Sequence, residues 1–95
     1  MKVTIDEALK KAVSAHKLGE LNIAENLYQA ILKSQPTHPD ANHNLGVLAV
    51  SVNNAAAALP FLKNAVEASP KTEQFWLSYI KVLIQEKHIE NANKC

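Results

Sequence analysis

Two histidines, an aspartate and two asparagines lie close together between His38 and Asn44. Imidazole and carboxylate groups at such short range are what a zinc site or a general base requires. His38 and His43 are five residues apart, and on a helix this spacing turns the two rings about 140° away from each other. His38 also precedes Pro39, which favours an extended or capping position over the body of a helix. The sequence therefore favours turn and surface roles for this cluster, and we expect no metal and no cofactor.

The motifs of the common enzyme classes are absent from the chain. It contains no glycine-rich phosphate loop, no nucleophile elbow and no His-Glu-x-x-His motif. Its single cysteine, Cys95, is the last residue and cannot form an intrachain disulfide. We therefore expect a protein that is not an enzyme, with the reducing cytoplasm as its default location.

The composition is that of one small globular domain, residues 1–95. The chain is 47% hydrophobic and 20% charged, and its ten basic residues nearly balance its nine acidic ones. A nucleic-acid-binding domain usually shows a marked basic excess. The sequence has neither the long apolar run of a membrane helix nor the apolar core of a secretory signal. We expect neither a nucleic-acid nor a membrane partner.

The elements that must position any functional side chains are helices, and they repeat. Ala24, Ala58 and Ala92 are 34 residues apart, and Pro36 and Pro70 share this spacing. Strong helix formers dominate, and apolar residues follow helical spacing. Turn signals separate the helical segments, which pair as 5–17 with 22–35, 39–51 with 54–69, and 73–87 with a short segment at 89–95.

This pattern resembles the tetratricopeptide repeat, a 34-residue helix–turn–helix unit. The second repeat carries the closest match, with Leu45-Gly46, Ala49, Ala55, Ala58, Leu62, Ala65 and Pro70 at the family's positions. The resemblance implies an all-α fold: a right-handed α-solenoid of antiparallel helix pairs with about 2.7 repeats. The repeats would cover residues 5–38, 39–72 and 73–95, the last one truncated.

In this family the first helix of each repeat lines a concave groove that binds a peptide or a partner protein. Carried over by register, the resemblance implies groove positions at Asp6, Leu9, Lys10, Val13, His16, Lys17, Asp40, His43, Asn44, Val47, Val50, Ser51, Gln74, Leu77, Ser78, Lys81, Ile84 and Gln85. Of the clamp that grips chaperone carboxylates in one subgroup, only Asn44 is present. The apolar members of the set suit an amphipathic helix or an apolar peptide. The alternative is that these valines and leucines pack between neighbouring repeats.

The resemblance implies a protein-interaction scaffold, and it also leaves a second function open. Repeats similar to "HPDANHNLGVLA" typically precede bacterial glycosyl-, methyl- or sulfotransferase domains, so the chain could be an accessory N-terminal module of a larger transferase. The third repeat also lacks a covering helix over Trp76, Tyr79, Ile80, Leu83 and Ile89. A second copy of the chain could cover this end and form a homodimer.

Several residues carry local predictions. Gly46 lies within a helix, where we expect a neighbouring helix to approach too closely for a side chain. Ala58 should have the same role on the following helix. Pro60 predicts a kink in that helix or a late start. Thr37 and Thr72 are candidates to cap the helices that follow them.

Overall fold

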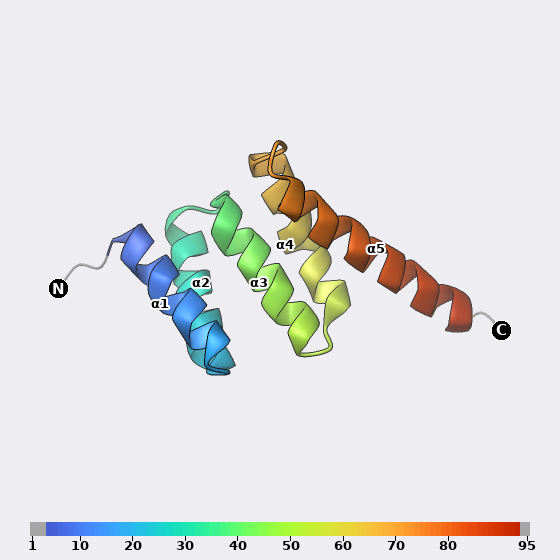
Figure 1. Ribbon diagram of the computed structural model, residues 1–95, viewed down its shortest axis with the longest axis horizontal. Coiled ribbons are helices and arrows are strands. Elements are labelled where there is room, and N and C mark those ends of the chain that lie inside the picture. The colour runs from blue at the N-terminus through green and yellow to red at the C-terminus, as the bar shows by residue number, and fades with distance from the viewer. Residues whose placement is uncertain (1–3, 94–95) are drawn as a thin grey trace.

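The computed structural model describes the backbone of residues 4–93 and the side chains of residues 4–87. This part of the chain is all-α and folds into five helices. They are α1 (Ile5–Lys17), α2 (Leu21–Ser34), α3 (Pro39–Ser51), α4 (Ala55–Ala68) and α5 (Glu73–Asn93). The molecule measures 55 × 29 × 19 Å (Figure 1). No helix in the described residues is both long and apolar enough to cross a bilayer.

The helix ends follow from local chemistry. Thr4 and Glu7 form a reciprocal capping box at the start of α1, and the residues after α1 turn through Gly19 at a φ of 82°. Asn53 adopts the same left-handed conformation in the turn between α3 and α4, at a φ of 62°. The sequence suggested Thr37 as the cap of α3, but Thr37 does not have this role. His38 caps the helix instead, because its Nδ1 accepts a hydrogen bond from the Ala41 N–H at 3.1 Å.

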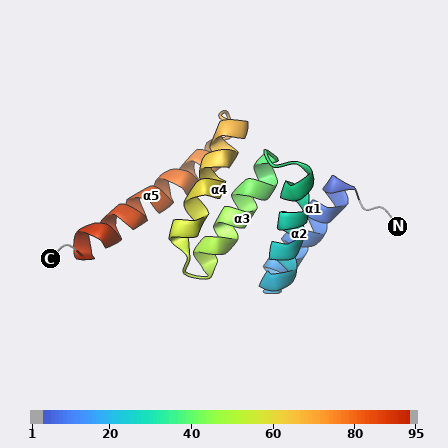
Figure 2. The same ribbon diagram turned by 180° about the vertical axis from the view of Figure 1, so that it is seen from behind.

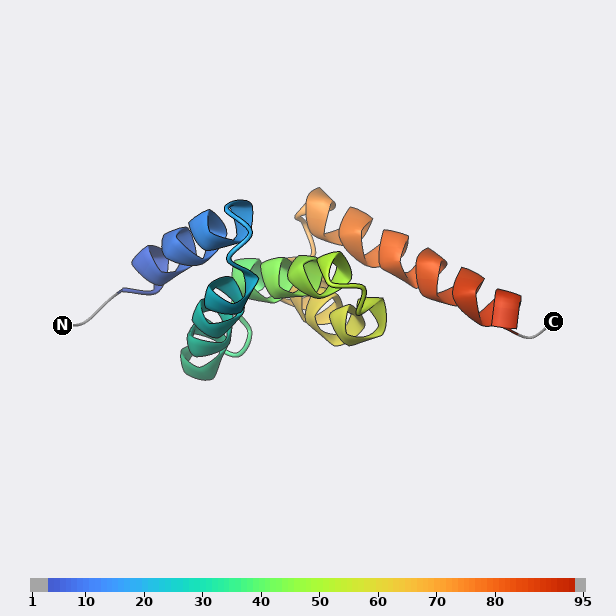
Figure 3. The same ribbon diagram turned by 90° about the horizontal axis from the view of Figure 1, so that it is seen from below.

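Each helix packs on the next one along the chain, and α3 also contacts α1 and α5. The helices α1, α3 and α5 lie on one side, and α2 and α4 lie behind them (Figures 2 and 3). Three groups of buried side chains join the layers. The first joins α1, α2 and α3, the second joins α3, α4 and α5, and the third joins α4 to the start of α5.

The expected close approach at Gly46 is present. A Cβ atom there would lie 2.7 Å from Leu62 Cδ2 and 3.4 Å from the Ala58 carbonyl oxygen. Ala24 and Ala58 are both completely buried, as their shared position predicts. The helix α4 begins at Ala55, so Pro60 does not delay its start. Inside the helix Pro60 removes the N–H that would bond to the Ala56 carbonyl.

The predicted division of the third repeat is wrong. We expected a helix over 73–87 and a second one over 89–95, but α5 runs without a break from Glu73 to Asn93. The reason lies at Lys87, which is 34 residues after Asn53 and 68 after Gly19. Glycine and asparagine adopt the left-handed conformation that ends a helix, whereas lysine is a good helix former and pays a steric cost there. The C-terminal half of α5 projects beyond α4 (Figure 1).

Candidate functional site

The concave face lies between α1, α3 and α5, and its central hollow has a volume of about 450 Å³. Tyr28 of α2 forms part of its wall. The other lining residues were all implied as groove positions: Val13, His16, Lys17, His43, Asn44, Val47, Gln74 and Ser78. The fold therefore brings residues from three helices, separated by up to 65 positions in the chain, to one surface.

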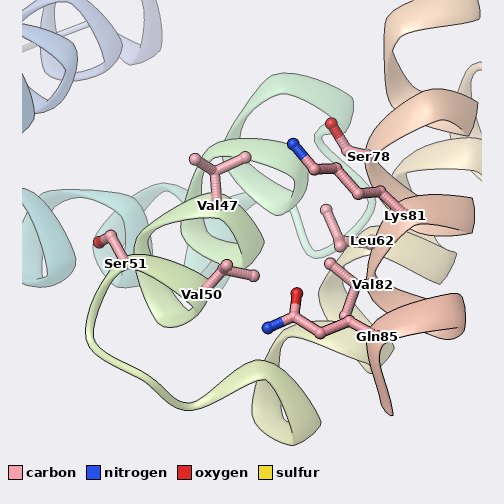
Figure 4. Close-up of a pocket in the computed structure, with 8 residues that line it drawn as sticks. All are labelled: Val47, Val50, Ser51, Leu62, Ser78, Lys81, Val82 and Gln85. Atoms are coloured by element: carbon pink, nitrogen blue, oxygen red, sulfur yellow. The ribbon is translucent and has the colours of Figure 1, made fainter. Parts of the chain in front are cut away.

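A second hollow of about 290 Å³ continues along α3 and α5 (Figure 4). Val47 and Val50 of α3 face Lys81 and Val82 of α5 across it. Ser51, Ser78 and Gln85 also line it. The completely buried Leu62 belongs to its lining and comes from α4 behind. Val47 and Ser78 line both hollows, so the two are adjacent parts of one trough.

The remaining groove positions fall into two groups. Leu9 and Lys10 lie in a shallow hollow of about 320 Å³ on α1, together with Val13 and Lys17. Four residues line none of these three hollows: Asp6, Asp40, Leu77 and Ile84. Leu77 and Ile84 are 60% and 64% exposed and lie at the outer edge of the α5 surface.

The apolar residues at the groove positions were expected either to form a binding surface or to pack between neighbouring repeats, and the structure contains both cases. Leu9 and Val50 pack partly against the buried clusters and also line hollows, so each has both roles. Val47 is exposed at the junction of the two hollows, which is the surface role. The apolar residues at the implied positions therefore do not all have one role.

His43 is the residue whose environment the sequence did not reveal. It was expected to face the groove, but it is only 5% exposed, with its ring stacked on Phe75 at 4.6 Å between centroids. Its Nε2 lies 2.7 Å from the Ser78 hydroxyl, and its Nδ1 lies 3.3 Å from the Asn44 side-chain oxygen. The ring therefore joins α3 to α5 across the floor of the concave face. The partners in α5 lie more than 30 residues away in sequence, so local patterns cannot indicate them.

Burial sets the charge state of the titratable groups at the centre of this face. It lowers the pKa of His43, and Asn44 and Asp40 offset part of this shift. Burial also raises the pKa of Tyr28, and Asn44 partly opposes it. Both groups are therefore neutral near pH 7. In the neutral ring, Nδ1–H can donate to Asn44 while Nε2 accepts the Ser78 hydroxyl proton.

A serine hydroxyl on a neutral imidazole is also the pair that nucleophilic catalysis uses. Here both residues lie inside helices, where the backbone N–H groups bond within the helix. The backbone N–H groups of His43 and Ser78 are therefore not free to stabilise an oxyanion. The arrangement favours a role in fixing the spacing of α3 and α5.

The remaining polar residues of the opening cluster hold the turn between α2 and α3. His38 caps α3, while the buried Asn42 donates from its Nδ2 to the carbonyls of Pro36 and His38 at 3.1 and 3.0 Å. His16 packs edge-on against Tyr28. No three His, Cys, Asp or Glu side chains gather in the part of the chain whose side chains are described.

The charged side chains that line the three hollows have one sign. The charged side chains that line the three hollows are Lys10, Lys17 and Lys81. Neither an aspartate nor a glutamate lines any of them. The surface thus combines exposed aliphatic groups, neutral hydrogen-bonding groups and ammonium groups, although the whole chain is close to neutral.

Two comparisons with known proteins complete this description. The chain matches no protein-family model, and a search of curated protein sequences finds no similar protein.

Proposed function

We propose that this chain is a tetratricopeptide-like α-solenoid that acts as a protein-interaction scaffold. Burial supports the repeat, because residues 34 apart are buried in pairs: Ala12 with Gly46, Ala15 with Ala49, Ala24 with Ala58, Tyr28 with Leu62, and Ile31 with Ala65. The two left-handed residues, Gly19 and Asn53, have the same spacing. Neighbouring pairs of helices then pack in equivalent ways, as in repeat proteins.

The concave face is the proposed binding surface, and the observation that carries this proposal is its chemistry. An exposed valine, Val47, lies at the junction of two hollows, and lysines from α1 and α5 lie around it. The complementary partner is a peptide segment that offers an aliphatic side chain to the hollows and carboxylates to Lys17 and Lys81. Helices α1, α3 and α5 hold these groups in place, so little ordering of the protein is needed on binding.

The test uses two synthetic amphipathic peptides with the same leucine pattern, one with glutamates and one with lysines on the polar face. We expect the glutamate peptide to bind more tightly in fluorescence anisotropy, with an affinity that falls as salt rises. Val47→Glu should abolish binding. Ile23→Glu is the matched control, because Ile23 is 50% exposed on α2 and outside the three hollows. Equal binding of both peptides, or undiminished binding by folded Val47→Glu, would remove the proposal.

A further inference from the structure

The helix α5 carries an apolar surface that no other described part of the chain covers. Its members are Trp76, Leu77, Ile80, Leu83 and Ile84, which are 39%, 60%, 47%, 41% and 64% exposed. We call these five residues the α5 stripe. The sequence also predicted that Tyr79 and Ile89 would be uncovered, but neither is counted in the stripe. Tyr79 packs against the buried clusters, and the side chain of Ile89 lies outside the described residues.

The α5 stripe is separate from both other surfaces of the helix. Phe75 and Val82 face α4 and the core, and Ser78 and Lys81 face the concave hollows. At 100° per residue, Ile80 lies about 160° from both Val82 and Ser78 around the helix axis. Lys81, which lines a hollow, is only about 40° from Leu77 and flanks the stripe. A partner centred on Ile80 would therefore lie away from the core and from the Ser78 side of the hollows, with Lys81 at its edge.

The stripe is symmetric about Ile80. Its other members lie three and four residues to either side, which is the alternating spacing of a helix–helix seam. Trp76 is held in place, since its Nε1 donates to the Pro70 carbonyl at 2.7 Å. Placed antiparallel over itself about Ile80, the helix brings Trp76 opposite Ile84 of a second copy and Leu77 opposite Leu83. Every apolar residue then meets another apolar residue.

The charges at the two ends of the stripe distinguish the possible directions. Glu73 and Lys87 are exposed and lie seven residues before and after Ile80. In an antiparallel pair each glutamate lies opposite the lysine of the other copy. In a parallel pair glutamate lies opposite glutamate and lysine opposite lysine, which is unfavourable. The helix is thus complementary to itself in one direction only.

The size of the stripe fits a weak dimer. With ordinary side-chain areas, the exposed fractions correspond to on the order of 500 Å² per copy, or about 1,000 Å² for a pair. This is near the lower limit for a specific interface. A concentration-dependent dimer is the outcome to expect from such an area.

We propose that two copies of this chain pair through α5, antiparallel, about a two-fold axis that passes by Ile80. The interface is isologous, so both copies use the same residues and each contact occurs twice about the axis. The pairing does not rest on peptide binding at the concave face, and either proposal can fail without the other.

Sedimentation velocity over low-micromolar to near-millimolar concentrations tests the pairing. We expect a monomer–dimer equilibrium that Ile80→Asp weakens at least tenfold, because two carboxylates would meet on the axis. Ile23→Asp is the control, an equally exposed isoleucine on α2. Glu73→Lys and Lys87→Glu should each weaken the dimer, and the double variant should restore it. A monomer at every concentration, or equal dimerisation of folded Ile80→Asp, overturns the proposal.

Cross-linking tests the direction in a Cys95→Ser background, which removes the chain's only cysteine. Mixed in equal amounts, Glu73→Cys and Lys87→Cys chains should form a disulfide-linked heterodimer under mild oxidation. Either chain alone should form far less. Efficient homodimers of each single variant would indicate a parallel pair, and no product above that of Ile23→Cys would indicate no pairing through the stripe. Both outcomes overturn the proposal.

Discussion

Gly46 allows a direct test of the packing between α3 and α4. Replacement by alanine removes the cost of glycine in a helix, which is about 1 kcal/mol in favour of the variant. The new Cβ atom would lie 2.7 Å from Leu62 Cδ2 and 2.8 Å from Leu62 Cγ. Leu62 is completely buried, so its side chain can yield to the new methyl group only by turning toward the adjoining hollow between α3 and α5. Overpacking of this kind costs about 1–3 kcal/mol.

The overpacking cost exceeds the gain in helix propensity by up to about 2 kcal/mol, so we expect Gly46→Ala to lower the free energy of unfolding by about 1 kcal/mol, or roughly 4–8 °C in melting temperature for a domain of this size. Urea denaturation followed by far-UV circular dichroism at low micromolar concentration measures this. The same substitution in a Leu62→Ala background supplies the control, since the shortened side chain leaves room for the methyl group. There the alanine at 46 should be neutral or stabilising. A rise in stability of about 1 kcal/mol on Gly46→Ala alone would show that helix propensity outweighs the contact, and would refute the reasoning.

Three further predictions concern buried or strained positions. Ala58→Leu should destabilise the domain by about 1–3 kcal/mol through overpacking, while Ala56→Leu on the exposed side of α4 should not; equal melting temperatures would contradict this. Burial lowers the pKa of His43 below 6.5, so the unfolded chain takes up its proton first as the pH falls. The free energy of unfolding, measured by urea denaturation, should thus be greatest above pH 6.5 and decline toward pH 5. The decline should be smaller in His43→Gln, and equal pH profiles of the two proteins would exclude the histidine as its cause. Asn53→Lys should cost about 1 kcal/mol because of the positive φ, whereas Asn53→Gly should be tolerated; similar midpoints for both would show that this backbone conformation is unimportant.

The helices and their close contacts could be predicted because they depend on local spacing. Apolar residues at helical intervals locate four of the helices, and the small residues Ala24, Gly46 and Ala58 mark where backbones approach each other. The continuous α5 was missed even though its signal was in the sequence. At the position that corresponds to Gly19 and Asn53, the predicted third repeat has Lys87, which continues a helix.

The environment of His43 could not be predicted in the same way. Its stacking on Phe75 and its hydrogen bond to Ser78 depend on the distance and rotation between α3 and α5. A repeat pattern gives the position of His43 within α3, but it does not say which side chains of the next repeat will fill the space beside it. Long-range packing alone converts a polar groove residue into a buried link between helices.

The helix α5 combines the two surfaces that carry our proposals. Ser78 and Gln85 line the concave hollows and lie about 160° and 140° around the helix from Ile80, while Lys81 lies between them and the stripe. Pairing through the stripe would therefore leave the Ser78 and Gln85 side of both concave faces open in a dimer. Two open faces in one particle strengthen binding to a partner that presents its segment more than once, with no change in the affinity of each face. A weak dimer interface and a shallow groove can together give selective binding that neither surface would give alone.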